Sequence, residues 1–301
     1  MAKKKLDLQK IDPITLPDDP VVKENYISTY MAVHQKTDLE AEGFYSKESI
    51  YYKQLLIANE KLKVATKISL YSAFLEGAIN GLSLQGGSKA EAYLESRNVN
   101  QGTRDKAAWV SIAFFRIQAY GELTMRIRAG QILHAYNPII VYEGDKFQPR
   151  TNESGDLIVD YEPVIPRKSK KIVASFIRLA LKHDKYDYKW LTVEDIDRLK
   201  KASCKALRND TGNALYSSGE DGQIDVGFLE AKTIKFAFRS YPKLKVGESA
   251  AIEDEDPTIN ENFDSGENTN VATPVINETD LAPDKDEAGK QTSIGDEEEP
   301  F

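Results

Sequence analysis

Apolar residues recur at helical spacing through the first third of the chain, which predicts a set of packed helices. Residues 21–37 and 46–65 both carry this spacing. A clearer stripe, with intervals of three and four residues, consists of Tyr71, Phe74, Leu75, Ala78, Ile79 and Leu82. We assign that stripe to the hydrophobic core and give it no functional role.

Extended segments follow after a glycine-rich break has ended the third helix. Residues 90–97 and 107–117 predict a β-hairpin with a polar connection. Residues 119–129 then predict a short helix. Gly130 marks its end, because glycine readily adopts the backbone conformation that closes a helix.

Predicted strands dominate the middle of the chain. Residues 131–143 lead into a turn at Gly144, and short extended runs continue to residue 162. Residues 172–181 are apolar at nearly every position, a pattern typical of a central strand covered on both faces. This strand is therefore expected in the middle of an antiparallel sheet.

Two further helices complete the predicted fold. Thr192 and Asp195 have the spacing of a capping box, which predicts a helix that runs to about Leu207. A final helix at residues 224–241 places Ile234, Ala237, Phe238 and Tyr241 on one face, and Pro242 ends it. A second face of this helix carries Lys232, Lys235 and Arg239. These elements predict the α+β fold class.

Both ends of the chain are polar. Residues 1–20 are punctuated by proline, and residues 248–301 are rich in Asn, Asp, Glu, Thr, Pro and Gly. Segments of this composition bury too little apolar surface to fold, so both are predicted to be disordered. One folded domain is therefore expected at residues 21–247.

Charge divides the chain in the same way. The net charge is −8, but residues 248–301 hold 17 acidic and 2 basic residues, a charge of −15. The remaining 38 basic and 31 acidic residues give residues 1–247 a charge of about +7. A basic body with an acidic tail is one of the few compositional signals that point to nucleic acid, although a solvated surface would give the same counts.

The expected compartment follows from cysteine use and hydropathy. Cys204 is the only cysteine, so it forms no intramolecular disulfide, and a reducing compartment is expected. No stretch has the apolar character of a signal peptide or a membrane span, so we expect a protein that is neither secreted nor anchored.

The common motifs of enzymes are missing. The sequence has no phosphate-binding GxxxxGK[ST], no GxGxxG, no GxSxG and no HExxH. The histidines His34, His134 and His183 are far apart and are expected to be structural. We therefore expect a protein that is not an enzyme and has no cofactor or metal, with a metal-dependent DNA nuclease and an oligomeric DNA-binding scaffold as the alternatives.

Cationic side chains interleaved with aromatic and polar ones are the main candidate chemistry. Cations neutralise phosphates, and aromatic rings stack on bases without selecting sequence, so this mixture suits single-stranded nucleic acid. The candidate DNA-binding residues are Arg116, Tyr120, Arg126, Arg128, Gln131, Lys168, Lys170, Lys189, Trp190, Lys232, Lys235 and Arg239.

Several segments of the chain resemble the RecT family of phage and prophage single-strand annealing recombinases. The resemblance is carried by AYGELTMRIRAGQI at residues 119–132 and IVYEGDKF at residues 140–147. Later segments agree in order, namely YKWLTVEDI at residues 188–196 and EAKTIKFAFRSYP at residues 230–242. The chain departs from the family at residues 118–121, where it has QAYG in place of Gly-Tyr-basic-Gly.

The resemblance implies a compact Rad52-like, RecT-like annealing fold with an antiparallel sheet and packed helices, to which the composition adds the disordered acidic C-terminal tail. It also implies function without ATP in homologous recombination and repair, in the cytoplasm of a bacterial host. The expected partners are single-stranded DNA, the annealed duplex intermediate, further copies of the chain in a ring or helical filament, and a 5′-to-3′ exonuclease.

The acidic tail ends in a motif of its own. Residues 295–301 read GDEEEPF, which resembles the tail tip of bacterial single-stranded DNA-binding proteins. Pro300 and Phe301 are therefore candidates for binding host proteins that recognise such tips. Competition of the tail with DNA, and generic acidic disorder, are the alternatives.

Overall fold

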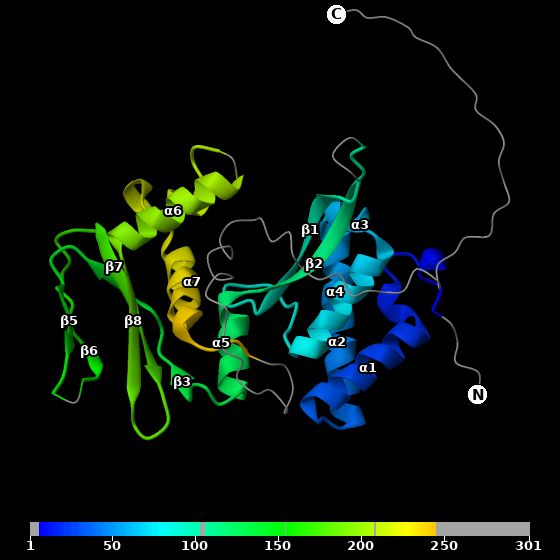
Figure 1. Ribbon diagram of the computed structural model, residues 1–301, viewed down its shortest axis with the longest axis horizontal. Helices are drawn as coiled ribbons and strands as arrows, with labels where there is room; N and C mark the ends of the chain where they lie inside the picture. The colour runs from blue at the N-terminus through cyan, green and yellow to red at the C-terminus, as the bar shows by residue number, and fades with distance from the viewer. Residues whose placement is uncertain (1–5, 103–105, 154, 208, 245–301) are drawn as a thin grey trace, which may run out of the picture. The chain divides into compact units, whose positions relative to one another are not determined.

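Four helices form the first part of the structure, a computed structural model that describes residues 6–102, 106–153, 155–207 and 209–244 (Figure 1). They are α1 (Pro20–His34), α2 (Asp38–Ala58), α3 (Glu60–Lys63) and α4 (Lys67–Asn80). Their apolar sides meet in one core. Phe74, Ala78 and Leu82 of the predicted stripe are buried there, which confirms its assignment to the core.

A capping box determines where α2 begins. The Thr37 side chain accepts a hydrogen bond from the Glu40 N–H, and the Glu40 carboxylate accepts one from the Thr37 N–H at 3.0 Å. That backbone hydrogen bond, with Lys36 alongside, lowers the pKa of Glu40 to about 2. Helix α2 therefore starts at Asp38 and not at the predicted residue 46.

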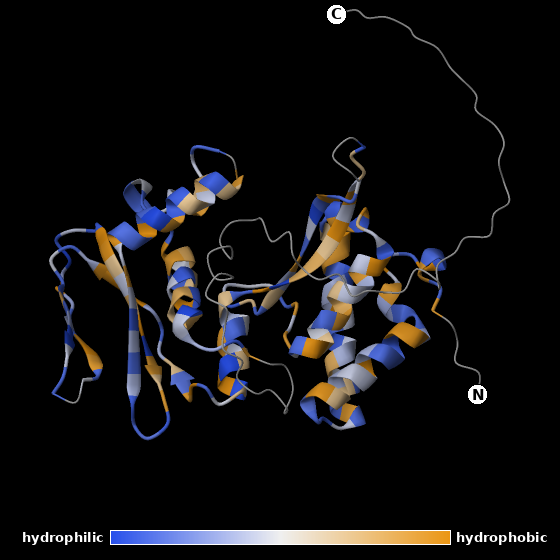
Figure 2. Ribbon diagram, viewed as in Figure 1, coloured by the Kyte–Doolittle hydropathy of each residue, from blue (hydrophilic) through white to orange (hydrophobic). Residues whose placement is uncertain are grey.

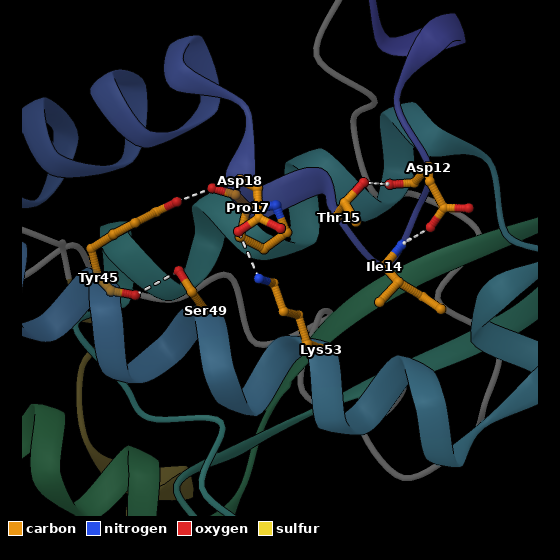
Figure 3. Close-up of polar contacts among 8 residues, drawn as sticks. All are labelled: Asp12, Ile14, Thr15, Pro17, Asp18, Tyr45, Ser49 and Lys53. Atoms are coloured by element: carbon orange, nitrogen blue, oxygen red, sulfur yellow. Dashed lines mark hydrogen bonds and ion pairs between the residues drawn. The ribbon is translucent and has the colours of Figure 1, made fainter.

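The segment before α1 is folded onto α2. It contains two short 3₁₀ helices, Leu8–Lys10 and Leu16–Asp18, and Leu16 is fully buried. The Tyr45 hydroxyl donates to the Pro17 carbonyl, and Lys53 forms an ion pair with Asp18 at 2.6 Å (Figure 3). The prediction of disorder for residues 1–20 is therefore wrong for residues 6–20, because buried side chains and long-range hydrogen bonds hold them.

Strands β1 (Ala92–Asn100) and β2 (Trp109–Ile117) form the predicted hairpin. They pair antiparallel from Ala92 opposite Ile117 to Asn100 opposite Trp109. Alternate residues, including Leu94 and Phe115, join the core of the helices, while the other face of the ribbon turns away from that core.

A second sheet is built around β7 (Ile172–Ala180), which confirms the predicted central strand. Strands β3 (His134–Ala135) and β4 (Ile139–Tyr142) pair with one edge of β7, and β8 (Tyr186–Thr192) pairs with the other, all antiparallel. Figure 2 shows β7 as largely hydrophobic and β8 as more hydrophilic. A separate hairpin consists of β5 (Lys146–Thr151) and β6 (Leu157–Glu162).

Helices cover one face of this sheet. Helix α7 (Val226–Ala237) packs on β7, where the Thr233 hydroxyl donates to Ser175 at 2.8 Å and Ile177 shares a core with Ile234. Helix α6 (Val193–Leu207) begins at the predicted capping box and adds Ile196 to the neighbouring core. The opposite face of β7 contacts the β5–β6 hairpin, through Phe176 and Phe147.

The remaining elements agree closely with the sequence pattern. Helix α5 (Ala119–Arg128) is followed by Gly130 at φ +69°, as expected for a glycine that closes a helix. Three short 3₁₀ helices complete the described fold, at Ala214–Tyr216, Glu220–Gly222 and Phe238–Ser240. The fold is α+β with antiparallel strand pairing, as predicted. None of the described helices has both the length and the apolar character to cross a bilayer.

Candidate nucleic-acid interface

Two of the predicted DNA contacts, Arg126 and Gln131, are structural. The Arg126 guanidinium is buried and donates to Glu122 at 2.7 and 3.1 Å, to Gln131 at 2.6 Å and to the Pro242 carbonyl at 3.1 Å. The Gln131 amide donates to the same carbonyl at 3.3 Å. Arg126 also stacks on Phe238, 4.7 Å from the ring centroid. These contacts join α5 to the end of the last helix, so both side chains have a structural role.

The other predicted cations near α5 hold local structure as well. Arg128 is exposed but donates to the Gly81 carbonyl at 2.7 Å, so it caps the C-terminal end of α4. On the hairpin, the Arg116 guanidinium pairs with Glu95 at 3.0 Å and stacks on Phe114. The Tyr120 ring is partly buried, and this burial raises the pKa of its hydroxyl.

Predicted residues around the sheet lie on different surfaces. Lys168 and Lys170 are exposed in the loop before β7, where Lys170 pairs with Glu220. Lys189 pairs with Asp187 at 3.3 Å on the face of β8 that meets the last helix. Trp190 points to the other face and packs against a cluster that contains Phe176.

The basic side chains of the last helix are spread around it. Lys232 lies over the Phe228 ring, 5.2 Å from its centroid, and Lys235 is partly buried. Arg239 is exposed next to Phe236 in the 3₁₀ turn that follows α7. The twelve predicted residues therefore occupy several separate places, and Pro300 and Phe301 lie outside the described residues.

A surface that the sequence analysis missed lies on the face of the second sheet opposite α7. Arg178 in β7 has its guanidinium carbon 3.7 Å from the ring centroid of Tyr136 and 5.1 Å from that of Tyr186. Tyr188 is its cross-strand neighbour in β8. We call this set, Tyr136, Arg178, Tyr186 and Tyr188, the tyrosine face.

Strand alternation explains why these side chains gather. Ser175, Ile177 and Leu179 of β7 point to α7, so Phe176 and Arg178 share the opposite face. Tyr136 extends β3 past its last bridge, where its N–H donates to the Arg178 carbonyl at 3.0 Å. Three adjacent strands therefore bring one arginine and three tyrosines together.

The tyrosine face is open to solvent. The β5–β6 hairpin packs over Phe176, but Tyr136 and Tyr186 remain 37% and 44% exposed. The two rings lie 6.5 Å apart between centroids at an interplanar angle of 51°. Exposed aromatic rings that gather on one sheet face are typical of interaction sites.

The tyrosine face is also cationic. Partial burial alone would lower the pKa of Arg178, but its hydrogen bond with Tyr188 and the nearby tyrosines raise it, so the charge is permanent. The β7–β8 turn adds the exposed lysines Lys182 and Lys185. His183 and Asp184 between them have φ of 61° and 54°, the left-handed conformation that turns the chain between the two strands.

Rings and cations in this arrangement suit unpaired bases. A base can stack on an exposed tyrosine ring, while arginine and lysine neutralise the neighbouring phosphates. Sheet faces with exposed aromatics bind single strands in this way in several protein classes. Duplex DNA keeps its bases stacked inside, so it offers the rings nothing comparable.

The sequence contains signals that could have identified this face. Arg178 is the only charged residue in the apolar run 172–181. Tyr186, Tyr188 and Trp190 alternate, which places all three on one face of a strand. Arg178 meets these tyrosines because β7 and β8 are neighbouring strands of the sheet.

The histidines and carboxylates of the described residues form no metal site. His34 lies 2.9 Å from the Ala78 carbonyl, and burial lowers its pKa. His134 stands edge-on to Tyr136, with ring centroids 5.0 Å apart. Within the described part of the chain, no group of three or more His, Cys, Asp and Glu side chains is arranged to hold a metal ion.

Comparison with known proteins adds no assignment. No protein-family model matches the sequence, and no curated protein matches it either. The resemblance to the RecT family therefore stays a prediction that rests on the segments quoted above.

Proposed function

We propose that this protein binds single-stranded DNA on the tyrosine face and anneals complementary strands without ATP. The observation that carries the proposal is Arg178, stacked 3.7 Å from Tyr136 and 5.1 Å from Tyr186 on an open sheet face. Stacking and phosphate neutralisation read no sequence, so Watson–Crick pairing supplies all specificity. Stacking occupies only the faces of the bases, so their Watson–Crick edges remain available to a complementary strand.

The biological setting is proposed from the resemblance to the RecT family. The protein acts in homologous recombination after a 5′-to-3′ exonuclease has exposed a single strand, in a bacterial cytoplasm. It assembles along that strand as a ring or helical filament with a Rad52-like fold. The motif at Pro300 and Phe301 recruits host proteins that bind the tails of single-stranded DNA-binding proteins.

Fluorescence anisotropy with a labelled oligothymidine tests the site. Tyr136→Ala and Tyr186→Ala should each weaken binding about tenfold, because one stacked base contributes about 1–3 kcal/mol. Tyr136→Phe and Tyr186→Phe keep the rings and should bind like the wild type. Tyr93→Ala is a matched control, since Tyr93 is 39% exposed on the β1–β2 hairpin, away from the tyrosine face.

Salt dependence separates stacking from charge at the same surface. Arg178→Gln should reduce the slope of log K against log salt by about 0.7, the value for one phosphate contact on a single strand. The tyrosine variants should leave that slope unchanged and lose affinity equally at all salt concentrations. Wild-type affinity in Tyr136→Ala, Tyr186→Ala and Arg178→Gln would place the DNA elsewhere on the molecule.

A further inference from the structure

Helix α2 has large apolar side chains on two opposite sides. Its core side consists of Ala41, Tyr45, Glu48, Ser49, Tyr52 and Leu56. On the other side, Leu39, Ile50 and Ile57 are 81%, 56% and 61% exposed. At 100° per residue these three lie within about 20° of one another and half a turn from Glu48. We call them the outer stripe.

The space along the outer stripe admits a second helix. Gly43 and Ser46 fall between Leu39 and Ile50 on this side, and both are exposed. A Cβ added at Gly43 would meet no atom within 4 Å. Small residues between large ones form the holes that side chains of a packed helix enter.

The outer stripe is symmetric along the helix. Leu39 and Ile57 are equally far from Glu48 on either side of it, and so are Ser46 and Ile50. A second α2 laid antiparallel across this midpoint puts each Leu39 on the other copy's Ile57. It also puts each Ile50 against the small Ser46. An isologous pair needs this self-complementary pattern.

Charges on one flank favour the same antiparallel arrangement. Glu42 and Lys53 lie on this flank, nearly equidistant from Glu48, and are about half and one-third exposed. Within the chain they pair with Lys23 and Asp18. In an antiparallel pair each Glu42 faces the other copy's Lys53. In a parallel pair this flank lies on opposite sides of the contact in the two copies, so these opposite charges do not meet. Antiparallel helix dipoles add to the preference.

We propose that the outer stripe is a self-association surface, on which two copies of this chain pair through antiparallel α2 helices with two-fold symmetry. Each copy uses the surface once, so the contact closes at a dimer. It is therefore distinct from the head-to-tail contacts of a ring or filament. The inference does not depend on the tyrosine face or on DNA.

Sedimentation of the full chain without DNA, over a range of concentrations, tests the surface. The wild type should show a monomer–dimer equilibrium, and Ile50→Lys with Ile57→Lys should weaken it at least about tenfold. Ile165→Lys is the matched control, because Ile165 is 83% exposed in a loop. Circular dichroism verifies that each variant is folded, which is expected since the changed side chains are exposed.

Disulfide trapping then tests the orientation, in a Cys204→Ser background. A mixture of Leu39→Cys and Ile57→Cys proteins should form a mixed disulfide dimer, while Leu39→Cys alone should not. Glu42→Lys and Lys53→Glu should each weaken the dimer, and their combination should restore it. A monomeric wild type, a dimer that tolerates the lysine substitutions, or a disulfide formed by Leu39→Cys alone would overturn the proposal.

Discussion

Replacing Arg126 by alanine should destabilise the fold and leave the tyrosine face in place. The side chain is 5% exposed and makes four hydrogen bonds, two to Glu122 and one each to Gln131 and the Pro242 carbonyl. Removing one partner of a buried ion pair costs about 3–5 kcal/mol. Glu122 is 29% exposed and can be hydrated, so we expect a loss near the lower end, about 3 kcal/mol.

Urea unfolding followed by circular dichroism measures this loss. With a slope of about 3 kcal/mol per molar urea, suitable for a chain of this size, the midpoint should fall by about 1 M. Arg126→Lys keeps the charge but loses the planar guanidinium, so its urea midpoint should lie between those of the wild type and Arg126→Ala. At a temperature where the variants are folded, single-stranded DNA affinity should be unchanged. An unchanged midpoint together with weakened DNA binding would refute the structural role.

Two further variants test local packing and burial. Gly121→Ala should destabilise by about 1–3 kcal/mol in thermal unfolding, because its Cβ would lie 2.1 Å from the Glu91 carbonyl oxygen, whereas Gly86→Ala in open space should have no effect. Glu48 is buried, and although it binds the Leu84 N–H at 2.7 Å, burial raises its pKa. The stability that protonated Glu48 contributes is full below the pKa of the unfolded chain and is lost as pH rises through the higher pKa of the folded protein. Glu48→Gln should therefore become more stable relative to the wild type as pH rises above the ordinary range of a glutamate, and a stability difference that stays constant with pH would contradict this.

Periodicity predicted most elements of the fold because it reports which side of an element is buried. The hairpin, the central strand and the capping box at Thr192 all appear where the pattern placed them. The start of α2 was missed because the outer stripe gives that helix apolar residues on both sides, which blurs a single-sided pattern. Residues 6–20 were missed because their fixation depends on partners far along the chain, such as Tyr45.

The candidate site was harder to predict than the fold. Charge near an aromatic residue cannot distinguish a buried arginine from a phosphate contact, and Arg126 shows the difference. The partners of Arg126 include Phe238 and the Pro242 carbonyl, which lie more than a hundred residues further along the chain, so the sequence around α5 does not reveal them. Arg178 was missed because it lies in an apolar run that predicts a buried strand, although its side chain lies on the tyrosine face.

The most direct test of the central claim is the rate at which two complementary, dye-labelled oligonucleotides pair in buffer without ATP. The account predicts strong acceleration by the wild-type protein, with both strands left intact. A Tyr136→Ala and Tyr186→Ala double variant should lose the acceleration, and the corresponding phenylalanine variant should keep it. No acceleration by the wild type, cleavage of either strand, or equal acceleration by the alanine variant would contradict the account.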